Sequence, residues 1–196
     1  MRELYNEGRH CFLKYRHHDV VDWSSGYGSL FYRSYSCEFS SKGSPESIIQ
    51  AIRKDVNIYL NPRLAWFKDS PQILETGAEY MIRIQGPWNG PVLLSHTEKF
   101  KFVLLTRNKH MEAGIIQFSA CLTKNKVRFE ISSLARCQDF LSWVLYEPLG
   151  LNRYFQYCMW RDFLLRVAKN HATFEQEIEI LDVTKKISWK VFNEMV

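Results

Sequence analysis

The chain has 196 residues, of which 46% are hydrophobic and 15% aromatic, so it can bury a full core within one domain and is not a disordered chain. Its net charge of +5 comes from scattered lysines and arginines without a recognised binding motif, which argues against a nucleic-acid partner. No apolar run is long enough to form a bilayer-spanning helix, so we expect no integral membrane segment.

The five cysteines are odd in number, lie far apart in the sequence and form no Cys-x-x-Cys motif. Several of them fall within apolar strand or helix patterns, which is typical of reduced core residues in a cytosolic protein. The first residues, among them Arg2, Glu3 and Glu7, lack the apolar stretch of a signal peptide. We therefore predict a cytoplasmic protein without a metal site and without a cofactor.

The N-terminal part of the chain contains an extension followed by a strand. Residues 1–27 are predicted to be an extension whose apolar side chains, such as Trp23, dock onto the body of the protein. A first strand is predicted for residues 30–39, because Phe31, Tyr35, Cys37 and Phe39 lie at alternate positions, with Arg33 interrupting the pattern.

A helix is predicted to begin at Ser44, because serine is a favourable N-cap, Pro45 suits the first helical position and Glu46 places an acid in the first turn. Its apolar stripe continues to Leu60, just before an Asn-Pro pair that ends the helix. Residues 64–67 form a short apolar segment that we interpret as a second short helix.

Five strands are then predicted in close succession, at residues 79–85, 92–98, 101–107, 113–122 and 127–133. In residues 79–85, 113–122 and 127–133 apolar and polar residues alternate, and short polar turns separate the strands. Strands joined by tight turns form an antiparallel meander, and no spacing typical of a parallel sheet is present.

A long helix is predicted for residues 149–169, where apolar residues cover most of the circumference, so the helix should be buried on more than one side. The segment 171–196 beyond it is too apolar for a free tail, and we expect it to pack on the body or on a partner chain. The predicted organisation is therefore an N-terminal extension at 1–27, one domain at 28–170 and a C-terminal extension at 171–196.

This order of elements resembles the helix-grip fold of the START-like, or SRPBCC, superfamily. Several stretches look like one uncharacterised bacterial domain family within it: Gly86–Val92, Phe100–Phe102, His110–Phe118, Val127–Arg136 and Tyr146–Leu149 leading to Gln156. The chain departs from the family pattern at Ala135-Arg136-Cys137, where that family usually has Ser-Arg-Pro.

The resemblance implies an α+β fold in which a curved antiparallel sheet of about six or seven strands wraps around a long C-terminal helix. It also implies two short helices after the first strand and a hydrophobic cavity between the sheet and the long helix. It implies no known activity, because the family has none that can be transferred.

A set of mostly apolar or aromatic side chains is predicted to line this cavity. The candidates are Arg33, Tyr80, Ile82, His96, Phe102, Phe118, Phe129, Tyr154 and Cys158, with Trp88 and Trp160 as further aromatics. The helix face that carries Tyr154, Cys158 and Leu165 is expected to face the strands, opposite Phe118 and Phe129. The alternative is that these side chains fill the interior completely and leave no cavity.

Catalysis would require polar groups that converge inside the cavity. His96 and Glu98 share one strand face with Val92 and Leu94, so an interior His/Glu pair could act as a general base; the alternative is an exposed pair at the strand end. His110 and Glu112 flank a turn, where an exposed ion pair is the expected arrangement. Cys158 is expected to be a core thiol and not a nucleophile.

Three functions remain open from the sequence. The first is binding of a hydrophobic small molecule, such as a lipid or polyketide-like compound, with Arg33, His96 or Glu98 orienting its polar end. The second is an enzyme of cyclase or hydrolase type that uses His96 and Glu98. The third is a protein-interaction or oligomeric subunit, for example a homodimer, in which the segment from Thr173 and the turn at Trp88 form the contact.

Overall fold

The computed structural model describes residues 1–85, 89–146 and 151–194. The chain forms one antiparallel sheet in the strand order β2-β3-β4-β5-β6-β7-β1-β8. Its strands are β1 (Tyr27–Phe39), β2 (Ala65–Phe67), β3 (Glu79–Ile84), β4 (Asn89–Thr97), β5 (Lys101–Thr106), β6 (Glu112–Thr123), β7 (Lys126–Cys137) and β8 (Ile180–Ile187). The fold is α+β, and the meander predicted for the middle of the chain is confirmed.

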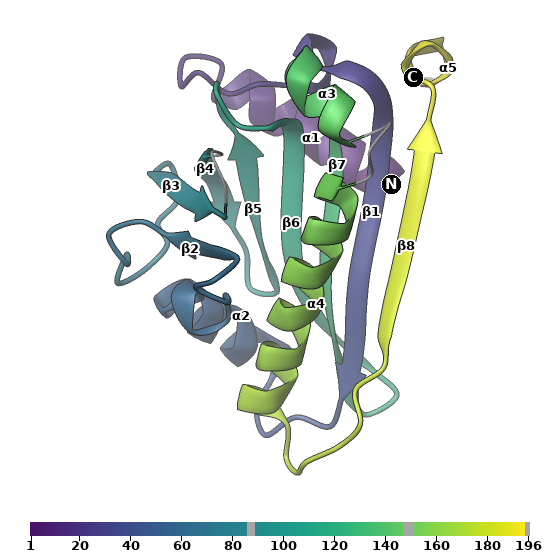
Figure 1. Cartoon of the computed structure of the whole chain (residues 1–196). Coiled ribbons are helices and arrows are strands. Elements are labelled where there is room, and N and C mark those ends of the chain that lie inside the picture. Colours follow the sequence, from purple (N-terminus) through teal and green to yellow (C-terminus); the bar gives the residue numbers. More distant parts are fainter. Residues whose placement is uncertain (86–88, 147–150, 195–196) are drawn as a thin grey trace.

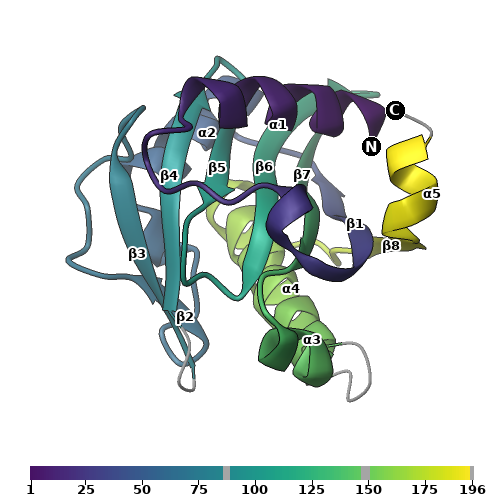
Figure 2. The ribbon, with the colours of Figure 1, turned by 90° about the horizontal axis from the view of Figure 1, so that it is seen from above.

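The helices lie on both faces of the sheet. They are α1 (Arg2–Lys14), α2 (Pro45–Lys54), α3 (Phe140–Tyr146), α4 (Leu151–His171) and α5 (Trp189–Glu194), with short 3-10 turns η1 (Trp23–Ser25) and η2 (Val56–Ile58). Figure 1 shows α4 lying along the concave face of the sheet, with α2 beside it. Figure 2 shows α1 crossing the opposite, convex face over the middle strands. This arrangement is consistent with a helix-grip type of fold.

Because both faces of the sheet are covered, its middle strands are buried on both sides. Phe102 and Leu104 of β5 belong to the core beneath α4, whereas Val103 and Leu105 belong to a second core beneath α1. The sequence of a strand that is buried on both faces is a continuous run of apolar residues and does not alternate between apolar and polar residues. The apolar sequence of β5 therefore follows directly from its position between two helical layers.

The start of α2 is as predicted, but its end is not. The Ser44 side chain accepts a hydrogen bond from the Ser47 backbone N–H, and Pro45 occupies the first turn. The helix then ends at Lys54, before the predicted end at Leu60. Beyond it, the Asn57 side chain forms two hydrogen bonds with the backbone of Phe67, at 3.0 and 2.8 Å, so this polar side chain binds a neighbouring strand instead of a helical turn.

Two further expectations about the elements are wrong. The predicted second short helix is strand β2, which pairs Ala65 and Phe67 with β3; three apolar residues do not distinguish a helix from a strand. The sheet has eight strands among the described residues, not six or seven, because β2 and β8 join it. The predicted long helix is α4, which spans 21 residues, and the segment that follows it contains β8 and α5.

The two ends of the chain pack on the sheet. Residues Leu4, Cys11 and Phe12 of α1 are buried against its convex face. Strand β8 pairs along β1 from Leu30 to Cys37, and the Phe192 ring of α5 meets the Tyr5 ring edge-on at 5.0 Å. None of the helices among the described residues is long and apolar enough to cross a membrane.

Candidate functional site

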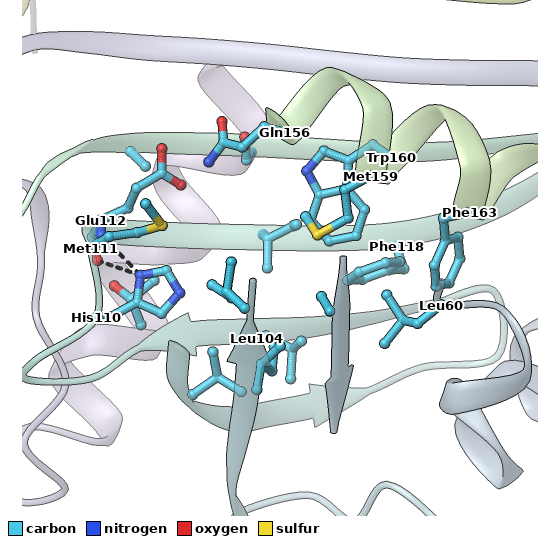
Figure 3. Close-up of a pocket in the computed structure, with 18 of the residues that line it drawn as sticks. Leu60, Leu104, His110, Met111, Glu112, Phe118, Gln156, Met159, Trp160 and Phe163 are labelled. Atoms are coloured by element: carbon cyan, nitrogen blue, oxygen red, sulfur yellow. Dashed lines mark hydrogen bonds between the residues drawn. The ribbon is translucent and has the colours of Figure 1, made fainter. Parts of the chain in front are cut away.

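An internal cavity lies between the concave face of the sheet, helix α4 and the segment from η2 to β2 (Figure 3). The volume of this cavity is about 80 Å³. Its wall is mostly apolar, and the few polar side chains gather at one end. The cavity therefore has an apolar end and a polar end, which differ in what they can do to a bound molecule.

Aromatic rings dominate the apolar end, around Phe118, Trp160 and Phe163 (Figure 3). The Phe118 ring centroid lies 5.6 Å from that of Phe163 and 5.7 Å from that of Trp160. Behind it, Phe102 stacks on Phe118 with the ring centroids 4.6 Å apart. Such contacts fix the rings in defined orientations, so this end of the cavity is a preformed surface for an apolar or aromatic group.

The polar end contains a buried ion pair. Glu112 is the first residue of β6, and its Oε1 lies 3.0 Å from a terminal guanidinium nitrogen (Nη1) of Arg33, which comes from β1. The Arg33 side chain is buried, and the Glu112 side chain is only 12% exposed. Glu112 lines the cavity, whereas the predicted pocket residue Arg33 is not among the lining residues. Because the two charges compensate each other, the polar end is electrically neutral where this pair lies.

His110 lies beside Glu112 at the same end of the cavity (Figure 3). Its Nδ1 lies 2.9 Å from the Glu112 backbone nitrogen and 3.1 Å from the Glu112 carbonyl oxygen. Because the backbone N–H can only donate, Nδ1 accepts the shorter of these hydrogen bonds. Burial lowers the pKa of His110 below its ordinary value, although the neighbouring Glu112 carboxylate acts in the opposite direction. His110 is therefore a neutral imidazole at neutral pH with its proton on Nε2, where it can be donated.

Gln156 of α4 completes the polar end (Figure 3). Its side chain is only 9% exposed, and its Oε1 has no hydrogen-bond partner among the residues that the structure describes. Gln156 belongs to the buried face of the helix, with Met159, Phe163 and Val167 at the three- and four-residue steps that place side chains on one face. The sequence prediction did not include Gln156 among the pocket residues, and a polar residue within an apolar stripe is the signal that could have identified it.

His96 and Glu98 lie on the opposite side of the sheet from the cavity, and their predicted interior position is wrong. The register between β4 and β5 shifts after Leu94, so Ser95 is an extra residue and His96 pairs with Val103. Such a bulge reverses the alternation of the strand. His96 therefore shares a face with Val103, beneath α1, and not with Leu94, which belongs to the core beneath α4.

At this position His96 takes part in an ion-pair cluster with helix α1. Its Nε2 lies 2.9 Å from Glu7 Oε1 and 3.5 Å from Glu98 Oε1, and its Nδ1 lies 3.6 Å from Cys11 Sγ. The contacts with Cys11 and with the Glu7 carboxylate raise the pKa of His96 to about 9. The Lys101 ammonium lies 2.8 Å from Glu7 and 3.4 Å from Glu98, so these carboxylates already have a cation between them.

This cluster predicts a pH dependence of stability. The folded pKa of His96 lies above its unfolded value of 6.5, so its contribution is fully present below pH 6.5 and is lost as the pH rises to 9. We expect the free energy of unfolding to fall by on the order of 2 kcal/mol over this range. Urea unfolding at a series of pH values measures this fall in the free energy of unfolding. His96→Asn should remove this component, and His18→Asn, at an exposed ion pair, should leave it in place; an unchanged pH dependence in His96→Asn would refute the role of the cluster.

Of the other predicted pocket residues, Ile82 and Phe118 line the cavity. Phe102 and Phe129 are buried behind its wall, where each stacks on an aromatic neighbour. Tyr80 lies outside the lining: its hydroxyl accepts a hydrogen bond from a backbone N–H of the loop before β3.

The predicted face of the long helix is wrong. Tyr154 is 72% exposed, and Cys158 and Leu165 are only partly buried and do not line the cavity. Phe163 of this helix faces the strands in their place. Apolar residues surround almost the whole circumference of the helix, so the sequence pattern did not distinguish this face. Trp88 and most of the Tyr146–Leu149 motif lie outside the described part of the chain, which omits residues 86–88 and 147–150.

No known protein family model matches the sequence, and no curated protein matches it. Solved structures do resemble the fold. Protein Ms6760 from Mycobacterium smegmatis aligns with a TM-score of 0.51 at 11% identity, over 74% of this chain and 93% of Ms6760. KanY aligns with a TM-score of 0.49 at 11% identity, over 74% of this chain and 98% of KanY.

DynU16, a protein in the dynemicin biosynthetic locus, aligns with a TM-score of 0.45 at 10% identity, over 69% of this chain and 46% of DynU16. At 11% identity, the likeness to Ms6760 concerns the fold alone. The chain therefore shares the overall fold of Ms6760.

Proposed function

We propose that this chain is a helix-grip protein of the START-like superfamily and that it binds a small, largely apolar molecule in the cavity between the sheet and α4. The observation that supports this proposal is the cavity itself, whose wall is apolar and aromatic while its few polar groups gather at one end. Small-molecule sites in proteins have this composition: apolar walls provide affinity, and a few polar groups fix the orientation.

The free volume sets the size of the ligand. A buried water needs about 10–15 Å³ of such space, so the 80 Å³ available corresponds to roughly five to eight water-sized groups. A larger molecule requires side chains to move, and Met111 and Met159 in the wall are suited to this because methionine has a flexible side chain. A ligand that buries about 200 Å² of apolar surface would gain roughly 5 kcal/mol before the costs of binding.

Native mass spectrometry of freshly purified protein tests the proposal, followed by solvent extraction to identify the bound compound. We expect an added mass that disappears after extraction. Ile116→Phe places a larger side chain in the cavity wall and should abolish the adduct, whereas Leu122→Phe, on the same strand but 70% exposed, should retain it. An adduct that survives unchanged in Ile116→Phe would place the bound compound elsewhere.

The two alternative functions have less support. An enzyme based on His96 and Glu98 could not act on a molecule in the cavity, because both residues lie on the other side of the sheet. An oligomeric role retains one observation, namely that β8 is an edge strand on which Leu181 and Val183 are exposed. Sedimentation of full-length and tail-truncated protein tests that role, and a monomer in both cases would remove it.

A further inference from the structure

The two edges of the sheet differ in length. At one edge, β2 contributes three residues, and so short a strand offers little to a pairing chain. At the other edge, β8 runs for eight residues and pairs with β1 in an unbroken register from Ile180 to Ile187 (Figure 1). No described element pairs with the outer side of β8. Its outward backbone N–H and C=O groups therefore form a regular template for one more strand.

The side chains of β8 are accessible on both faces of the sheet. All six side chains from residue 181 to residue 186 are exposed. Because side chains alternate along a strand, Leu181 and Val183 lie on the convex face with Ile187, which packs against the core beneath α1. Asp182 and Lys186 lie on the opposite, concave face. The edge therefore presents apolar side chains on one face and opposite charges on the other.

A second copy of β8 can pair with this edge in only a few registers. In an antiparallel pair around a two-fold axis, facing residues share a face of the sheet, so one residue must lie on the axis and face itself. Asp182 or Lys185 on the axis would place two like charges opposite each other, which destabilises the pair. With Val183 on the axis, Asp182 faces an uncharged residue. With Thr184 on the axis, Asp182 faces Lys186 of the second copy, and this ion pair occurs twice.

From this self-complementarity we infer that the outer edge of β8 is a homodimer interface, in which two copies pair antiparallel with Thr184 on the two-fold axis. The two Asp182–Lys186 pairs then lie on the concave face, and two Leu181–Ile187 pairs lie on the convex face. Opposite charges and apolar side chains that face each other both stabilise an antiparallel pair.

Two further observations fit this interface. The Lys186 ammonium lies 6.0 Å from the centroid of the Phe31 ring, on the same face as the facing Asp182. Lysines on an edge strand deter pairing with strands in general, whereas a carboxylate at the matching position permits pairing with a copy of the same chain. Because no residue of β8 lines the cavity, the interface and the proposed ligand site are independent of each other.

A charge-swap experiment tests the interface. Asp182→Lys and Lys186→Asp each place like charges at both facing pairs, so each should weaken self-association at least about tenfold in sedimentation equilibrium. An equimolar mixture of the two variants restores opposite charges at both pairs and should form a heterodimer as readily as the unmodified protein dimerises. Glu75→Lys, the same kind of charge reversal at an exposed position before β3, should leave self-association unchanged.

Disulfide cross-linking tests the register. Facing Cα atoms in an antiparallel pair are about 4.5–5.5 Å apart, a separation that a disulfide can bridge. Thr184→Cys should therefore cross-link on oxidation, because only a residue on the axis faces itself. Lys185→Cys should not, since its two copies are displaced by two positions along the strands. The exposed Cys121 is common to both variants and gives the same background in each.

The outcomes are decisive for the interface and leave the proposed function to its own test. A protein that stays monomeric up to its highest soluble concentration would overturn the inference, whatever the cavity binds. So would a dimer that tolerates Asp182→Lys, or one that cross-links better through Lys185→Cys than through Thr184→Cys. Loss of dimerisation in both charge variants without recovery in their mixture would likewise exclude the pairing of Asp182 with Lys186.

Discussion

Replacing Phe163 with alanine is expected to lower the free energy of unfolding by about 3–5 kcal/mol, the usual cost of removing a fully buried phenylalanine ring. Phe163 is 1% exposed, and its ring lies between those of Phe118 and Phe129 on the strands. The loss combines the transfer of the ring from water with the cavity that it would leave. Chemical denaturation of the variant and the unmodified protein measures the effect.

Phe140→Ala on α3 is the matched control, because Phe140 is exposed and its loss should change the unfolding free energy by less than about 0.5 kcal/mol. A loss below about 1 kcal/mol in Phe163→Ala would contradict the position of α4 against the sheet. Because residue 163 also forms part of the cavity wall, the variant should accept larger apolar molecules than the unmodified protein does.

Removing Arg33 is expected to have an effect of similar size through a different mechanism. In Arg33→Met, Glu112 keeps its negative charge in a buried position without a counter-charge, and such a loss costs about 3–5 kcal/mol. The double variant Arg33→Met/Glu112→Gln removes both charges and should recover a large part of that stability. A double-mutant cycle from urea unfolding gives the coupling energy of the pair.

The Arg166–Asp162 pair on α4 provides the control, since both side chains are partly exposed and one helical turn apart. Arg166→Met should cost only about 0.3–0.5 kcal/mol. If Arg33→Met were as mild as Arg166→Met, the Arg33–Glu112 pair would be solvated, and the polar end of the cavity would not be an enclosed environment.

Local features of the fold were predictable from the sequence. The alternation of Phe118 and Ala120 on one strand and of Phe129 and Ile131 on the next predicts the hairpin formed by β6 and β7, and these side chains are buried beneath α4. The Ser44 cap was predictable for the same reason, because it depends on neighbours in the sequence. These features require no information about distant contacts.

Features that depend on distant contacts were not predictable. The bulge at Ser95 follows from how β4 pairs with β5, and no residue type marks it, so the face of His96 was assigned incorrectly. The orientation of α4 could not be deduced either, since apolar residues cover most of its surface, and the partly buried Cys158 looked as suitable for the core as Phe163. The polar end depends on Arg33 and Glu112, which meet only when β1 and β6 join the same sheet.

A crystal structure of the protein soaked in phenol tests the central claim most directly. We expect density for one phenol molecule inside the cavity, with its ring against Phe118 and Trp160. An interior without phenol, or phenol bound only outside the space between the sheet and α4, would contradict the claim that this cavity is a binding site.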